Sequence, residues 1–148
     1  MSQVYPKANI IIVNNNNNKN SIGESKNFRD KMTNLYVKAG RTDSAVKLVQ
    51  YFNTGFKSVT DNLKTDCDNI VITLATGEIF YTSYIRNLRN YADNFNITLF
   101  SPSNIIKYES LELEYLQDLN INIFSSNFVD YSKQEVKAFV NSFRNAYH

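Results

Sequence analysis

The sequence predicts an α/β fold: a three-layer αβα sandwich around a mostly parallel five-stranded sheet. The first observation is that the apolar runs are short, rich in β-branched residues and continuous, as between Ile10 and Val13 and between Ile70 and Ile72. Strands that are buried on both faces have this pattern, and such strands belong to parallel sheets covered by helices. The second observation is that segments with helical spacing separate the runs, so that strand and helix alternate five times. A length of 148 residues suits one such domain, which we expect to span residues 1–148.

Five strands are expected from the apolar runs. They lie at residues 8–13, 46–52, 69–75, 97–100 and 121–124.

Helical spacing marks the segments between the strands. In the first, the apolar face consists of Phe28, Met32, Leu35 and Tyr36, and Gly40 is a suitable end for the helix. Further helices are predicted at residues 56–63, 79–94 and 111–119. A final helix is expected to begin at Ser132, because Ser132 and Glu135 have the spacing of a capping box. Its apolar face consists of Val136, Phe139, Val140 and Phe143.

Composition excludes several classes of site. The net charge is +2, which favours neither nucleic acid nor an anionic membrane as a partner. With one cysteine, Cys67, and one histidine, His148, the chain has neither an internal disulfide nor the ligands of a cysteine or multi-histidine metal site. No apolar run approaches the roughly 18 residues of a membrane helix, and this segment shows no secretory signal. Five consecutive asparagines at residues 14–18 predict a solvated, asparagine-rich loop at residues 14–20.

Small polar residues follow the predicted strands at their carboxyl ends, where parallel sheets bind ligands. As ligand contacts at this edge we select Asn14, Asn53, Thr76, Gly77, Ser101 and Ser125. Their amides and hydroxyls suit a neutral or zwitterionic small molecule. The same residue types also cap helices and form turns, so a purely structural role stays open for each of them.

The enzyme signatures of this architecture are missing from the sequence. It contains no glycine-rich dinucleotide fingerprint, no phosphate loop that ends in Gly-Lys-Ser/Thr, and no Gly-x-Ser-x-Gly elbow. Asn14 and Thr76 stand where a receiver domain carries acidic residues and its phosphate-accepting aspartate, and asparagines replace the phosphate loop of a flavodoxin. We therefore expect a protein that is not an enzyme and that binds no cofactor and no metal.

The order of residues from Asp68 onward resembles a known family. The segments that carry the likeness are residues 68–72, 97–102, 113–120, 123–132 and 135–147, the last with the pattern Val-Lys-x-Phe-Val-x-x-Phe-Arg-x-x-Tyr. They resemble the second lobe of a type 1 periplasmic-binding-protein domain, the receptor-family ligand-binding fold of branched-chain amino acid ABC transporter substrate-binding proteins. The resemblance extends in particular to a Bacteroidetes version that is associated with LysM peptidoglycan-binding repeats.

This resemblance implies a function and a location. Proteins of this family bind a small polar ligand, such as an amino acid, in a cleft between two lobes, and they work outside the cytoplasm, in the periplasm or cell envelope. The chain would supply half of that cleft, and its partner would be a first lobe of the same parent protein. The alternative is a free-standing flavodoxin-like or receiver-like domain that binds a partner protein and has no catalytic activity.

Overall fold

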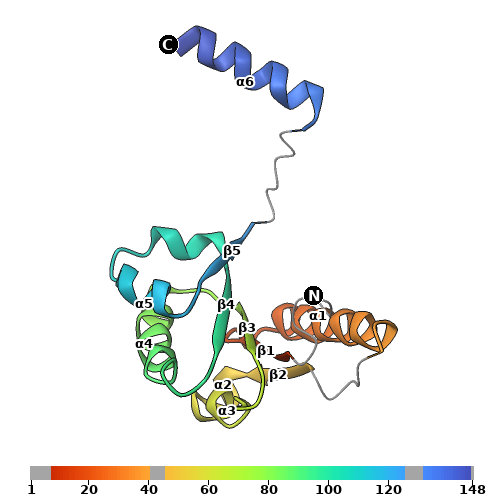
Figure 1. Ribbon diagram of the computed structural model, residues 1–148, viewed down its shortest axis with the longest axis vertical. Coiled ribbons are helices and arrows are strands. Elements are labelled where there is room, and N and C mark those ends of the chain that lie inside the picture. The colour runs from red at the N-terminus through yellow and green to blue at the C-terminus, as the bar shows by residue number, and fades with distance from the viewer. Residues whose placement is uncertain (1–7, 41–45, 126–131, 148) are drawn as a thin grey trace.

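The computed structural model of the chain describes residues 8–40, 46–125 and 132–147 (Figure 1). Its centre is one sheet of five parallel strands in the order β2-β1-β3-β4-β5. The strands are β1 (Asn9–Asn14), β2 (Val46–Gln50), β3 (Asn69–Leu74), β4 (Ile97–Pro102) and β5 (Asn122–Phe124). The prediction of an α/β sandwich with five parallel strands is confirmed.

Successive side chains of a strand point to opposite faces of the sheet, and in β1 both faces are buried, which explains its continuous apolar pattern. Ile10 and Ile12 of β1 face one side of the sheet, and Ile11 and Val13 face the other, and all four are fully buried. Because both faces of β1 meet apolar layers, no position in this run is free to be polar.

One face of the sheet carries most of the helices. They are α2 (Tyr51–Thr54), α3 (Lys57–Thr60), α4 (Glu78–Arg89), the 3₁₀ helix η2 (Ser103–Lys107) and α5 (Leu113–Asp118). Tyr81, Tyr84 and Leu88 of α4 are fully buried against this face, together with Leu99 of β4 and Leu119 after α5.

The opposite face is covered by α1 (Lys19–Lys38), which packs on β1 and β2. Tyr36 of α1 is buried there, and Phe28 and Met32 are half-buried against Ile12 and Ile72. The last helix, α6 (Gln134–Tyr147), lies apart from the sheet in Figure 1. No helix among the described residues is long and apolar enough to cross a membrane.

Several predicted boundaries were wrong. The helix expected at residues 79–94 ends at Arg89, and the final helix begins at Gln134 and not at Ser132. β2 ends at Gln50, and the aromatic residues at 51 and 52 begin α2 instead of extending the strand. β4 continues through Ser101 to Pro102, since its backbone pairs with β5 up to Phe124. The asparagine-rich loop is shorter than residues 14–20, because Asn14 ends β1 and α1 begins at Lys19.

Candidate functional site

The strand order creates a crevice between β1 and β3 at the carboxyl edge of the sheet. The chain leaves β1 through α1 on one face, and it leaves β3 through α4 on the other face. In open parallel sheets this divergence of neighbouring connections marks the usual ligand site. A cavity of about 250 Å³ lies here on the α1 side, and its lining consists of Asn14, Ser21, Glu24, Ser25, Phe28 and Leu74.

The asparagine run builds the connection from β1 into α1. The amide oxygen of Asn14 accepts the backbone N–H of Asn16 at 3.2 Å, and that of Asn16 accepts the N–H of Asn18 at 3.2 Å. Asn18 then caps α1, because its side-chain oxygen accepts the N–H of Ser21 at 2.8 Å. Short amide side chains satisfy backbone groups in turns and at helix starts, so these asparagines have a structural role that the loop prediction missed.

A partly buried polar relay lies beside the cavity, and two of its members, Asn14 and Ser25, line it. The Asn14 amide donates to the side-chain oxygen of Gln50 at 2.8 Å, and Gln50 donates to the Ser25 hydroxyl at 3.1 Å. Ser25 in turn donates to the Ile22 carbonyl at 2.8 Å. The relay joins β1, β2 and α1, and it leaves the Asn14 amide with partners for both its donor and its acceptor atoms.

The loops after β1 and β3 are tied together at the crevice. The Asn15 side chain donates to the Thr76 carbonyl at 2.8 Å and accepts the Thr76 N–H at 3.2 Å. The next residue, Gly77, has φ +100°, a conformation that L side chains rarely adopt, and its N–H donates to the Tyr108 hydroxyl at 3.1 Å. Thr76 and Gly77 are both exposed, and they form the rim between the two faces.

Ser101 faces away from this cavity. It is fully buried on the α4 side, where its hydroxyl donates to the Tyr81 hydroxyl at 3.0 Å. Tyr81 donates to the Ala75 carbonyl at 3.1 Å, and burial raises the pKa of Tyr81 to about 12. This network stabilises the core and does not present the serine to a ligand.

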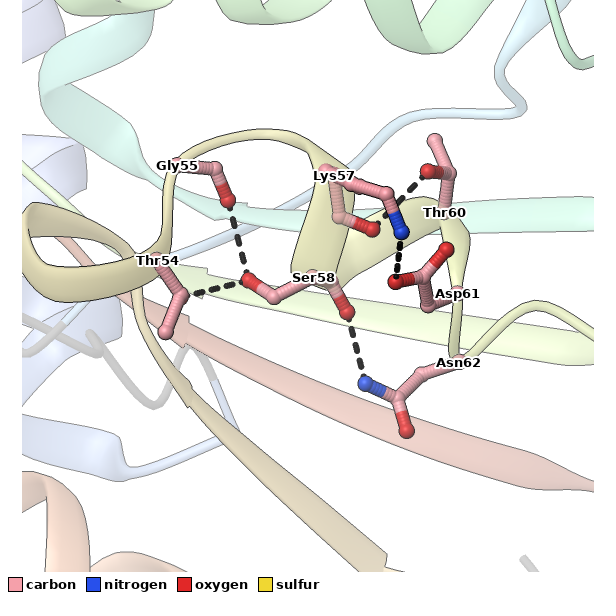
Figure 2. A network of polar contacts seen from close by, with 7 residues as sticks. All are labelled: Thr54, Gly55, Lys57, Ser58, Thr60, Asp61 and Asn62. Atoms are coloured by element: carbon pink, nitrogen blue, oxygen red, sulfur yellow. Dashed lines mark hydrogen bonds and ion pairs between the residues drawn. The ribbon is translucent and has the colours of Figure 1, made fainter.

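Asn53 lies in α2 and is exposed, beyond the end of β2. Figure 2 shows how the neighbouring turn is occupied: the hydroxyls of Thr54 and Ser58 are 2.6 Å apart, and Ser58 donates to the Gly55 carbonyl at 2.9 Å. An ion pair of 2.8 Å between Lys57 and Asp61 lies beside them. These polar groups stabilise the α2–α3 turn, and Asn53 does not line the cavity.

Ser125 follows β5 and is exposed at the far edge of the sheet. Four strand spacings separate β2 from β5, or about 19 Å, so Asn53 and Ser125 cannot contact one small ligand together. Of the six selected residues, the structure places Asn14 in the cavity lining and brings Thr76 and Gly77 to the neighbouring rim.

Glu78 is held by the loop that precedes α5. Its carboxylate accepts the backbone N–H of Ser110 at 3.0 Å and the Ser110 hydroxyl at 2.6 Å. These hydrogen bonds lower the pKa of Glu78, because they favour the charged form. A carboxylate that is engaged in this way fixes the loop and is poorly placed to transfer protons.

The cavity combines one carboxylate with hydroxyls and an apolar wall. Glu24 is its ionisable group, Ser21 offers a hydroxyl, and Phe28 and Leu74 supply apolar surface. Such a lining suits a small ligand that carries a cationic group and an apolar part. Within the described ranges, no three His, Cys, Asp or Glu side chains are grouped so that they could hold a metal ion.

Sequence reasoning missed most of this lining, because it identified the apolar face and the end of the first helix but not its start. Ser21, Glu24, Ser25 and Phe28 follow Asn18 at intervals that place them on one side of a helix, and this spacing was the available signal. Comparison with family models, with curated proteins and with solved structures found no match for the chain.

Proposed function

We propose that the chain is a non-catalytic ligand-recognition domain that binds a small polar molecule, such as an amino acid, at the β1/β3 crevice. The observation that carries this proposal is the cavity lined by Asn14 and by the first turns of α1 at that crevice. An ammonium group would pair with Glu24, and the side chain of the ligand would contact Phe28 and Leu74. The Ser21 hydroxyl would donate to a carboxylate of the ligand.

We further propose that the cavity is one wall of a cleft and that a second lobe of the same parent protein supplies the other wall. A volume of about 250 Å³ is below the usual range of roughly 300–1,000 Å³ for sites that enclose a ligand. The resemblance to receptor-family lobes supports the same arrangement, as well as a parent protein that works outside the cytoplasm. Because one wall buries little of the ligand, we expect this chain alone to bind with a dissociation constant on the order of 1 mM or weaker.

The test is a titration of the ¹⁵N-labelled chain with a panel of L-amino acids, followed by NMR. Shifts should concentrate at the amides of Ser21, Glu24 and Leu74. Glu24→Gln should weaken binding roughly fivefold, because a partly exposed charge pair contributes about 1 kcal/mol. Glu114→Gln, which removes an exposed carboxylate from α5, is the matched control and should have no effect.

Three outcomes would contradict these proposals. Absence of shifts at the cavity amides would contradict ligand binding there, and micromolar affinity of this chain alone would contradict the half-cleft. Clean turnover in a hydrolase and phosphatase panel, lost on changing Thr76, Glu78 or Ser101, would contradict a non-catalytic role. An immunoblot of native cells should show a band well above 17.1 kDa, and a band near 17.1 kDa would contradict the two-lobed parent protein.

A second candidate function is the binding of a partner protein, and a specific group of side chains supports it. Ile79, Ile106 and Leu113 are 91%, 71% and 69% exposed, and they lie near the contact between Glu78 and Ser110 in sequence. Exposed apolar side chains that form one contiguous patch are typical of interaction surfaces. Capture of one defined partner by the wild type but not by Ile79→Lys, together with no response to amino acids, would favour this function over the first.

A further inference from the structure

One half of a sheet face has no helix over it among the described residues. α1 packs on β1 and β2, and Ile70 and Ile72 of β3 are buried in the same cluster, whereas this face continues beyond α1 at the end of β3 and over β4 and β5 (Figure 1). On this half, Leu74 of β3 and Phe100 of β4 are half-buried, and Phe124 of β5 is 38% exposed. The register places them on the same side, since Ile72 pairs with Phe100 and Pro102 pairs with Phe124.

The edge of α1 extends this apolar surface. Phe28 lines the cavity together with Leu74, and Leu35, two helical turns further on, is 61% exposed. Residues seven apart lie on one stripe of a helix, so Leu35 borders the same half of the face. We call these five side chains the open strip: Phe28, Leu35, Leu74, Phe100 and Phe124.

α6 has the pattern that such a surface requires. Its apolar positions recur at intervals of three and four residues, at Val136, Phe139, Val140 and Phe143. Phe139 is 69% exposed, and its opposite face is polar, with Lys137, Asn141, Arg144 and Asn145 exposed. A helix with one apolar stripe is stable when that stripe packs against another apolar surface.

The dimensions of α6 and of the uncovered half agree. Fourteen helical residues span about 21 Å, and the six residues of β4 span about 20 Å. β4 and β5 together are about 10 Å wide, which matches one helix of about 10 Å diameter. β5 ends at the carboxyl edge of the sheet, so a helix that folds back from there runs antiparallel to the strands, as α1 does.

We propose that α6 packs on the open strip of its own chain, beside α1, and completes the second helical layer. Nine residues, 125–133, connect Phe124 to α6, more than the two to six that usually join a strand to its following helix. Nine residues still tether α6 to its own sheet, so its effective concentration there is in the millimolar range. This favours packing on its own chain over packing on a second copy. In this position the first turn of α6 lies beside Leu74 and forms a further wall of the cavity. The proposal does not depend on the identity of any ligand.

The test uses the absence of tryptophan from the sequence. Phe139→Trp in the full-length chain places a single indole on the apolar stripe of α6. Asn141→Trp, on the polar side of the same helix, is the matched control. If α6 packs on the open strip, the indole of the F139W variant emits further to the blue and is quenched several-fold less by acrylamide than that of N141W. Both properties should be independent of protein concentration, with a monomeric mass by light scattering.

A third variant locates the contact. Leu35→Glu changes an exposed position of α1, which the fold tolerates, and it should shift the emission of F139W toward that of N141W without changing the far-UV circular dichroism. Equal quenching of F139W and N141W would overturn the proposal. Protection of the indole that appears only as the chain dimerises would also overturn it, because α6 would then pack on a second copy. Protection that persists unchanged in the Leu35→Glu background would overturn it as well, because α6 would then pack on another surface. Amino-acid binding is not part of the readout, so failure of the proposed function leaves this result interpretable.

Discussion

The relay beside the cavity gives the most informative prediction about stability. Asn14→Ala removes three hydrogen bonds: those to the Asn16 carbonyl at 3.0 Å and to Gln50 at 2.8 Å, and the one accepted from the Asn16 N–H at 3.2 Å. Each buried hydrogen bond contributes about 1 kcal/mol net, so their sum is about 3 kcal/mol. Water can reach the Asn16 backbone, because that residue is only half-buried, and this lowers the expected loss to about 2–3 kcal/mol.

The loss is measured by urea unfolding, followed by far-UV circular dichroism. For a chain of this length it corresponds to a fall of roughly 5–10 °C in the midpoint of thermal unfolding. Asn17→Ala is the control: it changes an exposed asparagine of the same run, and the free energy of unfolding should stay within about 0.5 kcal/mol of the wild type. If Asn14→Ala were as mild as Asn17→Ala, the relay would not stabilise the fold and the Asn14 amide would be available to a ligand.

Three further predictions concern the glycines, a buried tyrosine and a buried asparagine. Gly77→Ala should lower the free energy of unfolding by about 1–3 kcal/mol, because φ is +100° there. Gly23→Ala, inside α1 and with open space around it, should raise the free energy of unfolding by about 0.5–1 kcal/mol. If urea unfolding gave both changes the same sign, the backbone argument would be refuted. Burial raises the pKa of Tyr81 to about 12 in the folded chain, so its neutral form stabilises the fold below pH ~10. This contribution is lost as the pH rises toward 12. A spectrophotometric titration in which all ten tyrosines ionise together near pH ~10 without unfolding would contradict the raised pKa of Tyr81. Asn69→Ala should lower the free energy of unfolding by about 2–4 kcal/mol, because this fully buried side chain hydrogen-bonds the N–H and the carbonyl of Lys64 and also the Asn9 amide. A loss below about 1 kcal/mol in urea unfolding would contradict the role of these hydrogen bonds.

The class of the fold could be predicted because its cause is local in the sequence. Ile10 to Val13 are apolar without interruption since both faces of β1 are covered, and the helical segments between the strands keep the spacing of one-sided burial. The end of β2 was not predictable in the same way. Tyr51 and Phe52 have the apolar character of strand residues, and no local pattern shows that they begin α2, where Tyr51 packs on the α4 side.

The candidate site was less accessible to sequence reasoning, because it depends on which strands are neighbours. Asn14 and Thr76 come together only because β1 pairs with β3, a long-range contact that no local pattern encodes. Ser101 was misplaced for a related reason: pairing with β5 extends β4 past it and turns its side chain into the core. The lining from α1 depended on one N-cap, Asn18, which is hard to distinguish among five identical residues.

The position of β1 in the sheet has a consequence for synthesis of the chain. β1 is made before β3, with which it pairs, and Asn9 meets Asn69 sixty residues later. At about 5–20 residues per second, a ribosome needs roughly 3–12 s to add that stretch. During this interval an apolar strand with no neighbour on its β3 side is exposed to other nascent chains. The segment of this protein at greatest risk of aggregation is therefore its first strand, and the risk ends only when β3 has emerged.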